Sequence, residues 1–233
     1  DLYENDIDKF VDYNLQDVKL VKKLDDKLDF IEIARGIAHL GHVPYEDVFM
    51  SSRYLEGAIL TYLKKQNIVA PNKPKKSNKT SDDKFVGAYV QEPQKGKHNW
   101  VFDLDITSMY PSCIMSLNIS PETKIGKLEG WNPEEFLKKD HKKTYTITNN
   151  QEELGRFTNT ELKNYLENRS IGVATNGVMY RTDKDGLLPA LLRKWFDERV
   201  EYRKLSKKFH EEGDKEQSDY FDRRQYLQKI ILN

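Results

Sequence analysis

Asp105 and the residues after it have the types and spacing of a metal and phosphate site. The stretch Asp105-Ile106-Thr107-Ser108-Met109-Tyr110-Pro111-Ser112 places a carboxylate at the end of an apolar segment, just before a turn into a helix. Residues 101–106 alternate, so Asp103 and Asp105 share one face of the predicted strand. The opposite face carries apolar side chains, namely Phe102, Leu104 and Ile106. Two carboxylates on one strand face predict a divalent-cation site.

The groups around Asp105 each suit one part of a metal-bound triphosphate. Asp105 would bridge metal ions, and the carbonyl of Ile106 would complete the shell of the metal that holds the triphosphate. The N–H groups of Ser108 and Met109, at a helix start, suit phosphate oxygens. The ring of Tyr110 would then lie under the sugar, where its bulk excludes a 2′-hydroxyl. The stretch therefore predicts a nucleotide-binding site.

Two helices are predicted near the C-terminus. Helical spacing runs from Gly186 to about Glu212, breaks at Gly213-Asp214 and resumes from about Ser218. Two antiparallel helices joined by a short turn form a helical hairpin. The buried stripe of the first helix consists of Leu188, Leu192, Trp195, Tyr202, Leu205 and Phe209.

Polar groups recur along this predicted hairpin. Arg199 falls within the apolar stripe, and Arg203 follows one turn later. On the second helix, Lys229 and Asn233 are also one turn apart. A lone Arg in such a stripe is better explained by an ion pair, but four such groups converging on one cleft would clamp a triphosphate.

The N-terminal region is predicted to be helical over residues 8–35 and again from Arg53 to Lys65, with the break at residues 36–44. Tyr13 and Asp17 lie four residues apart on the first helix, hence on one face. This spacing alone is common on ordinary helices.

The middle of the chain is predicted to contain strands. Residues 71–79 indicate an exposed linker, after which residues 85–90 and 100–106 have strand patterns. Asn176-Gly177 predicts a β-hairpin near Val173.

The remaining middle segments have weaker signals. The helix after Pro111 is expected to reach about Leu117, with Cys113 in a packing role. Residues 131–170 are interpreted as a charged, helix-leaning insert without recognisable chemistry.

Composition limits the class of protein. Lys and Arg number 38 and Asp and Glu also number 38, so a nucleic-acid partner would have to be met by local basic patches. The single cysteine fits a reducing compartment, and no apolar run approaches the length of a membrane span. We expect a soluble, cytoplasmic protein that is an internal segment of a longer chain, since neither end has a start or stop signal.

The stretch from Asp105 to Ser112 resembles the first palm motif, motif A, of family B DNA polymerases, DxxSLYPS, with Met109 in place of Leu. Asn118-Ile119-Ser120-Pro121-Glu122-Thr123 is similar to the replicative polymerases of tailed bacteriophages. The resemblance implies that Asp105 binds both catalytic metals and that Tyr110 is the sugar-discriminating gate.

Lys229 and Asn233 resemble the start of motif B, KxxxNSxYG. The resemblance implies that the predicted helical hairpin is the fingers, where Arg199 and Lys229 contact the phosphates of the incoming nucleotide. Arg203 is a weaker match.

Two shorter matches lie upstream. Tyr13 and Asp17 resemble the third exonuclease motif, in which the Asp binds metal and the Tyr orients the attacking water. Phe85, Gly87 and Ala88 resemble the template-contacting YxG(G/A) motif, with Phe85 in place of Tyr.

The resemblance implies an α+β fold with the right-hand polymerase architecture. The implied parts are the end of an RNase H-like exonuclease domain (1–30), a connecting segment (31–76), a partial palm with an antiparallel sheet (77–185) and the fingers (186–233).

The implied reaction is two-metal attack of a primer 3′-hydroxyl on a deoxynucleoside triphosphate, with 3′–5′ proofreading. It uses Mg²⁺, or Mn²⁺ in its place. The implied partners are primer–template DNA, deoxynucleoside triphosphates and a sliding clamp bound outside this chain.

Two alternatives remain open. Two-metal transfer needs at least a second carboxylate besides Asp105. The resemblance implies that it comes from a DTD motif downstream of motif B, and this chain has no DTD string, so the chain alone is expected to be inactive. It could therefore be the DNA-binding subunit of a split polymerase. Another palm-type nucleotidyltransferase, such as a primase or reverse transcriptase, is disfavoured by Tyr110-Pro111-Ser112 and by Lys229 and Asn233.

Overall fold

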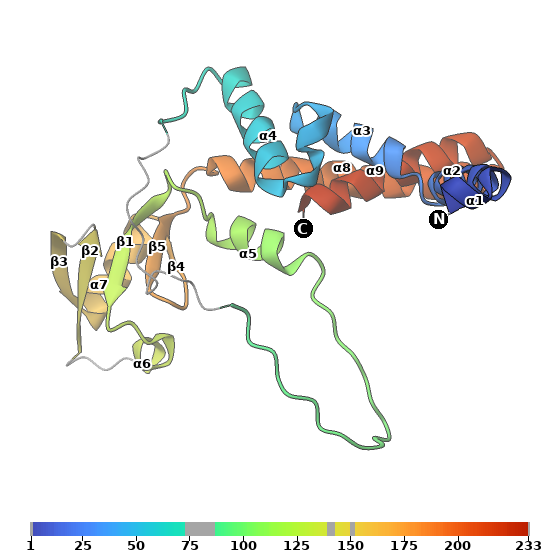
Figure 1. Ribbon diagram of the computed structural model, residues 1–233. Coiled ribbons are helices and arrows are strands. Elements are labelled where there is room, and N and C mark those ends of the chain that lie inside the picture. The colour runs from blue at the N-terminus through green and yellow to red at the C-terminus, as the bar shows by residue number, and fades with distance from the viewer. Residues whose placement is uncertain (1, 73–86, 139–142, 150–151, 233) are drawn as a thin grey trace.

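The computed structural model describes residues 2–72, 87–138, 143–149 and 152–232. It combines helices with an antiparallel sheet, so the expected α+β fold is confirmed (Figure 1). The elements, in chain order, are α1 (Leu2–Asn5), α2 (Ile7–Leu28), α3 (Phe30–Gly41), the 3-10 helix η1 (Tyr45–Phe49), α4 (Ser51–Lys65), α5 (Met109–Leu117), β1 (Lys124–Glu129), α6 (Pro133–Leu137), β2 (Thr144–Asn149), β3 (Glu152–Thr158), α7 (Asn159–Asn168), β4 (Ile171–Val173), β5 (Val178–Arg181), α8 (Leu187–Glu211) and α9 (Lys215–Leu232).

In the described part of the chain, the sheet has the strand order β3-β2-β1-β5-β4, and its neighbouring strands pair antiparallel. Helix α7 packs against β2, β3 and β4. The core between them contains side chains that expose 1% or less, namely Leu128, Tyr145, Ile147, Leu162 and Met179. We call β1–β5 with α6 and α7 the sheet unit.

The expectation of a helix-leaning insert over residues 131–170 was incomplete, because helices α6 and α7 lie in this segment but so do two strands. This segment contains strands β2 and β3 and helix α7, which supply much of the core. The strand signal lies in Tyr145 and Ile147, which alternate with threonines and point to one face. Charged residues dominate the composition of the rest of the segment, so the short alternation is hard to recognise.

The predicted hairpin forms from α8 and α9, which lie side by side. Leu191 and Trp195 of α8 pack with Ile231 and Leu232 of α9 and with Ala58 of α4. The rings of Phe209 and Phe221 stack near the turn, with centroids 5.5 Å apart.

Helix α9 begins at Lys215 rather than near Ser218. The side chain of Asp214 accepts a hydrogen bond from Gln217 N at 3.1 Å and so caps an earlier start.

The N-terminal helix is divided where the sequence predicts one helix. Asp29 adopts a left-handed conformation with φ 55°, which ends α2 and lets α3 begin in a new direction. Helix α3 then runs through Gly36, where the sequence predicts a break. A Cβ there would lie 2.3 Å from Leu227 Cδ1, so glycine permits α3 to pack closely on α9.

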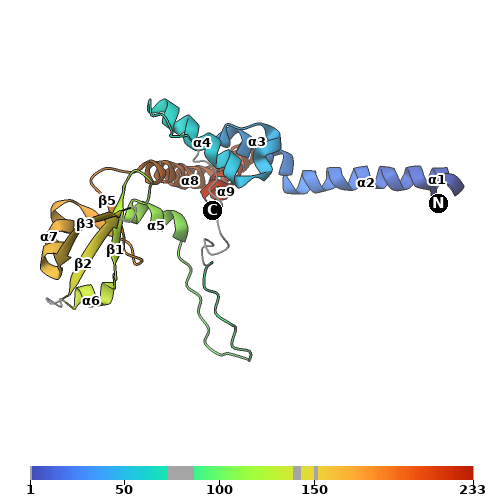
Figure 2. The ribbon, with the colours of Figure 1, turned by 60° about the vertical axis from the view of Figure 1, so that its left-hand side comes forward.

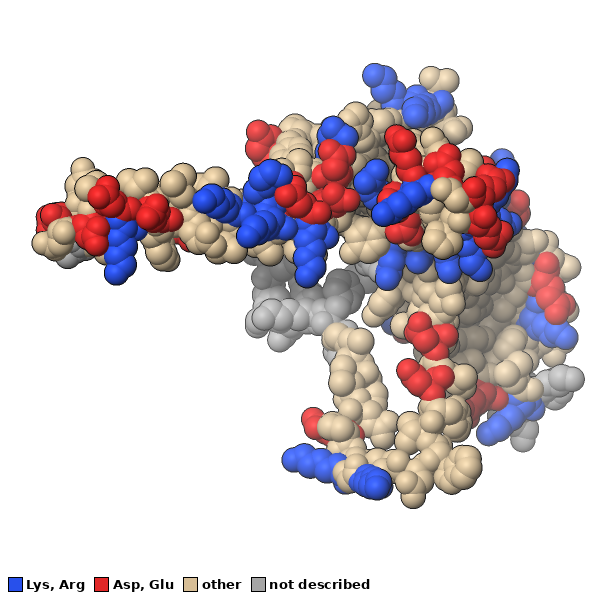
Figure 3. Space-filling model, turned by 90° about the vertical axis from the view of Figure 1, so that its right-hand side faces the viewer, with Lys and Arg blue, Asp and Glu red and all other residues tan. Residues whose placement is uncertain are grey.

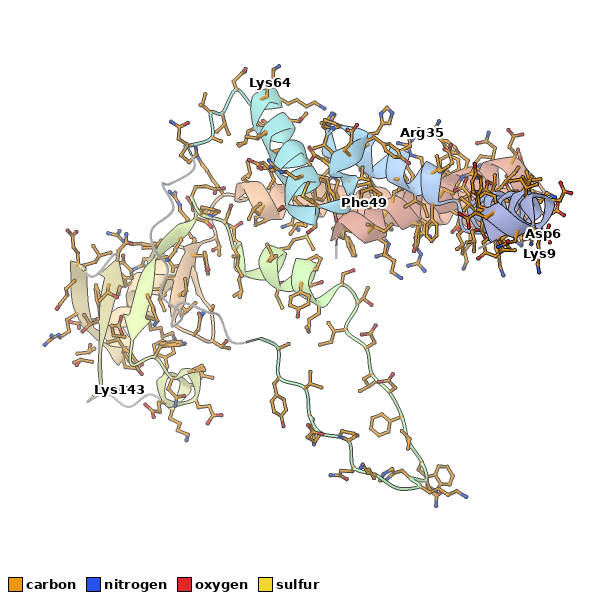
Figure 4. All side chains as sticks on the ribbon, in the orientation of Figure 1. Asp6, Lys9, Arg35, Phe49, Lys64 and Lys143 are labelled. Carbon is orange, nitrogen blue, oxygen red and sulfur yellow. The ribbon has the colours of Figure 1, made fainter. Side chains whose placement is uncertain are left out.

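Helices α1 and α2 form an arm that projects from the body of the molecule (Figures 2 and 3). Asp6 caps α2 by accepting a hydrogen bond from Lys9 N at 3.1 Å (Figure 4). No residue of α2 is buried, and its apolar side chains face solvent.

The strands expected at 85–90 and 100–106 are not formed in the described residues 87–106, while residues 85 and 86 lie outside the described ranges. This segment is an irregular loop, and none of the described helices or strands lies beside it (Figure 4). Phe102 and Leu104 expose 81% and 84% of their surface. A strand needs a neighbour for its backbone hydrogen bonds, and no described strand pairs with this segment.

The packing role expected for Cys113 was also wrong. Cys113 is exposed on α5, whose buried residue is Pro111. None of the helices in the described ranges is both long enough and apolar enough to cross a membrane.

Candidate active site

Asp105 lies on the exposed loop just before α5. Its carboxylate has no hydrogen-bond or ion-pair partner among the described residues, and Asp103 two residues upstream is also exposed. Within those ranges, no three or more His, Cys, Asp or Glu side chains gather so that they could hold a metal ion. Asp105 is therefore a free oxygen donor that needs further ligands to complete a site.

Helix α5 begins directly after this loop with its first N–H groups open. Ser108 has a left-handed backbone with φ 49°, which turns the chain into the helix, and its side chain makes no capping hydrogen bond. The Ser108 carbonyl accepts the bond from Ser112 N at 2.9 Å. Met109 and Tyr110 expose 45% and 65% of their surface. Met109 and Tyr110 thus lie exposed at the start of the helix, where the first N–H groups have no acceptor within the helix.

The helical hairpin has a basic groove along one side. Arg203, Lys204 and Lys207 of α8 line it opposite Asp222 and Gln225 of α9, and its volume is about 490 Å³. Both helices therefore contribute to one open polar surface.

Helical spacing assigns Lys229 to the same side of α9. Lys229 lies four residues beyond Gln225 and seven beyond Asp222, the two α9 residues in the groove lining. Lys229 is exposed. Asn233 lies outside the described residues.

Arg199 is half-buried on α8, four residues before Arg203. Its Nε is buried without a hydrogen-bond partner among the described residues. Burial lowers the pKa of the guanidinium, and the nearby charge of Arg203 lowers it further. A partly desolvated cation without an acidic partner favours an anionic ligand.

Some other cations of the hairpin differ from Arg199 because they have carboxylate partners. Arg193 lies 3.6 Å from Asp185, and Lys208 lies 3.8 Å from Glu212. Helices α5 and α8 are in contact, so the Arg199 helix and the helix that follows Asp105 belong to one packed region.

Tyr13 and Asp17 lie on the projecting arm, away from α5 and the hairpin (Figure 2). Tyr13 is 64% exposed, and no described carboxylate cluster includes Asp17. The structure therefore does not bring this pair together with Asp105 or Arg199.

Of the expected DNA-contacting residues, Gly87 and Ala88 are exposed at the start of the loop. A Cβ on Gly87 would have no neighbour within 4 Å in the part of the chain that the structure describes. Phe85 lies outside the described residues.

The residues after α5 have a structural role that their sequence pattern does not predict. The side chains of Asn118, Ser120 and Glu122 accept hydrogen bonds from the first N–H groups of α8. The signal in the sequence is a group of polar side chains directly after a short helix. It does not reveal their role, because their hydrogen-bond partners lie more than 60 residues away in the chain.

Comparisons with known proteins agree on one family. The family model described as DNA polymerase family B matches residues 48–233. The DNA-directed DNA polymerase of Escherichia phage RB69 is 27% identical over 202 residues, which cover 87% of this chain and 19% of that protein. DNA polymerase 1 of Pyrococcus abyssi is 26% identical over 231 residues, covering 97% of this chain and 24% of that protein.

A solved structure has the same fold. The family B DNA polymerase from the hyperthermophilic archaeon Pyrobaculum calidifontis matches with a TM-score of 0.61 and 24% identity, covering 94% of this chain and 23% of that one. This chain thus spans about a fifth to a quarter of the length of these relatives. Because the matched residues 48–233 are most of the sequence, the chain belongs to DNA polymerase family B.

Proposed function

We propose that this chain is a segment of a DNA-directed DNA polymerase that adds deoxynucleotides to a primer 3′-hydroxyl by two-metal phosphoryl transfer. The observation that carries the proposal is Arg199, a half-buried cation without a carboxylate partner among the described residues. Its helix packs on α5, the helix that follows Asp105. An incoming triphosphate would provide the missing negative charge.

The hairpin would be the fingers and would bind the triphosphate. Arg199, Arg203, Lys229 and Asn233 would donate charge-assisted hydrogen bonds to phosphate oxygens. These donors neutralise charge that develops on the leaving pyrophosphate, which lowers the barrier more than it stabilises the bound substrate.

Asp105 would be one of the metal ligands, with the carbonyl of Ile106 completing the shell on the triphosphate side. Carboxylate and carbonyl oxygens are the donors that Mg²⁺ prefers, and Mn²⁺ accepts the same set. When bound, two such ions would activate the primer hydroxyl and stabilise the leaving oxygen. Since two ions need at least a second carboxylate besides Asp105, this chain alone should be inactive.

Helix α5 would hold the sugar and phosphates. The open N–H groups of Ser108 and Met109 suit phosphate oxygens at a helix start. The exposed ring of Tyr110 would pack beneath the deoxyribose and exclude a 2′-hydroxyl by its bulk.

Residues 1–30 would be the end of a 3′–5′ exonuclease domain, and residues 31–76 would form a connecting segment. Residues 77–185 would form part of the palm, and residues 186–233 would form the fingers. On the arm, Asp17 would bind metal and Tyr13 would orient the attacking water. Phe85, Gly87 and Ala88 would contact the template.

The partners of the whole protein would be primer–template DNA and deoxynucleoside triphosphates, with a sliding clamp bound elsewhere. Cys113 is a free, exposed cysteine, and free cysteines are typical of the reducing cytoplasm. We therefore propose a cytoplasmic location.

The role of Arg199 is tested in the longer polymerase that carries this segment. Arg199→Ala should lower kcat/KM for nucleotide incorporation by about 100-fold or more, because a transition-state donor is lost. The matched control is Arg193→Ala, which removes an Arg on the same helix that pairs with Asp185, and it should change kcat/KM by less than about threefold. Equal losses in the two variants would reject the proposal.

A further inference from the structure

The first turn of α8 is capped by a distant loop rather than by its own residues. Its N-cap residue is Gly186, which has no side chain to cap the helix. Asn118 Oδ1 accepts from Gly186 N at 2.8 Å, Glu122 Oε1 from Leu187 N at 2.5 Å and Ser120 Oγ from Leu188 N at 3.4 Å. The next residue, Pro189, has no N–H to satisfy. Three successive donors of α8 are thus bound by the loop that ends α5.

The loop is fixed before it reaches α8. Asn118 and Ser120 expose 5% and 2% of their surface. Asn118 Nδ2 donates to the carbonyls of Arg181 and Lys184, both at 2.7 Å, and Thr123 Oγ1 donates to Asn118 O at 2.6 Å. The loop therefore ties the end of α5, the segment after β5 and the start of α8 into one network.

Glu122 adds a charge to this network. Burial alone would raise the pKa of its carboxyl, but the hydrogen bonds from Leu187 N and the Ser120 hydroxyl outweigh burial and lower the pKa. Ser120 Oγ donates to Glu122 Oε2 at 2.7 Å while accepting from Leu188 N. At neutral pH a carboxylate therefore lies at the positive end of the α8 dipole.

The contact leaves no room for a side chain at Gly186. A Cβ there would lie 2.7 Å from Ser120 Cβ and 2.9 Å from Thr123 Cγ2. Since its backbone is extended with φ −70°, this glycine is explained by close approach and not by an unusual backbone conformation.

We propose that Asn118, Ser120 and Glu122 are positioning residues that set the direction of α8 relative to α5. The proposal rests on the proposed nucleotide-binding role of the hairpin. Arg199 lies twelve residues along α8 from Leu187, which corresponds to about 18 Å of helix. A tilt of about 5° at the cap would move Arg199 by about 1.5 Å, and a misplacement of about 1 Å in an active site can cost 100-fold in rate.

The test uses the longer polymerase with Glu122→Ala and Glu122→Gln. The matched control is Glu161→Ala, because Glu161 also accepts backbone and hydroxyl hydrogen bonds at a helix start, that of α7, but does not join α5 to α8. Single-nucleotide incorporation gives KM and kcat. Spin labels on Cys113 of α5 and at position 207 on α8 report the direction of α8 relative to α5.

We expect Glu122→Ala to broaden the label distance and to raise KM for the nucleotide by about tenfold, with primer–template affinity unchanged. Glu122→Gln should recover part of both effects, because its amide oxygen still accepts from Leu187 N. Glu161→Ala should change KM by less than twofold. A Glu122→Ala variant whose label distances match those of Glu161→Ala would overturn the proposal, as would a raised KM without broadening.

The distance measurement is independent of catalysis. If the labels show broadening in a polymerase that proves inactive toward nucleotides, the positioning role stands and the proposed function fails. If activity depends on Arg199 but Glu122→Ala has no effect on either measurement, the proposed function stands and the positioning role fails.

Discussion

The sheet unit and the loop at residues 87–106 have similar alternating sequence patterns, but the first forms paired strands and the second does not. Tyr145 and Ile147 alternate with polar residues and are fully buried. Phe102 and Leu104 alternate with Asp103 and Asp105 in the same way and are more than 80% exposed. The first pair has paired strands and α7 around it, whereas the second has no described neighbour. Alternation thus predicts which residues share a face, but not whether another strand is available to pair.

The two regions also differ in how their helices begin. Helix α7 of the sheet unit has a complete capping box, with Thr158 and Glu161 bonded reciprocally. Helix α5, which follows the loop, starts at Ser108 without a side-chain cap. The sheet unit is stabilised by its own residues, while the segment that carries Asp105 keeps its polar groups open.

Matched leucine substitutions give the largest expected difference between the two regions. Leu162→Ala removes a side chain with 0% exposure and should lower the free energy of unfolding of the sheet unit by about 2–5 kcal/mol. Leu104→Ala, at 84% exposure, should change it by less than about 0.5 kcal/mol.

This comparison is measured by urea unfolding of the 233-residue chain. Trp131 packs on the sheet core, with its ring 5.7 Å from that of Tyr145. Its fluorescence reports the sheet unit when Trp100 and Trp195 are replaced by Phe in every variant. A loss above about 1 kcal/mol for Leu104→Ala would mean that the loop packs on the sheet unit in solution.

The contrast explains what sequence could predict of the fold. The helical hairpin was predicted because its apolar stripe recurs every three or four residues, which is a local signal. The strand predicted at 101–106 does not form because no described strand pairs with it, and the strands within 131–170 escape prediction because charged residues surround the short alternation at Tyr145 and Ile147.

The same limit applies to the site. Asp105, Tyr110 and Arg199 belong to short local patterns and could be selected from sequence. Asn118 could not be given a role, since its hydrogen-bond partners Arg181 and Gly186 lie 63 and 68 residues away.

Cap substitutions should give a smaller difference in the same direction. Thr158→Ala breaks the capping box of α7 and should cost about 1 kcal/mol of unfolding free energy. Ser108→Ala removes a hydroxyl that caps nothing and should cost at most a few tenths of a kcal/mol. Both are measured by urea unfolding followed by far-UV circular dichroism, which reports α5 as well as α7. Equal costs would show that α5 is capped in solution and that the two regions do not differ in this respect.

The smallest expected effect is a pH dependence of the sheet unit, caused by an ion pair just after β5. Arg181 binds Asp183 through both carboxylate oxygens, at 2.8 and 2.6 Å. The hydrogen bonds from Arg181 lower the pKa of Asp183 from 3.8 to about 2. Because the pKa is depressed in the folded state, this stabilisation is present above the unfolded pKa and disappears as pH falls through the folded one.

Between about pH 4 and pH 2, the sheet unit should therefore lose more stability in the unaltered chain than in Asp183→Asn. Arg181→Gln should match Asp183→Asn, because the depressed pKa depends on the guanidinium rather than on the carboxyl alone. Both substitutions are exposed, so the difference should be smaller than that of the cap variants. If Arg181→Gln kept the acid sensitivity of the unaltered chain, a carboxyl other than Asp183 would be its source. The Arg181–Asp183 pair would then not be among the interactions by which the sheet unit stabilises itself.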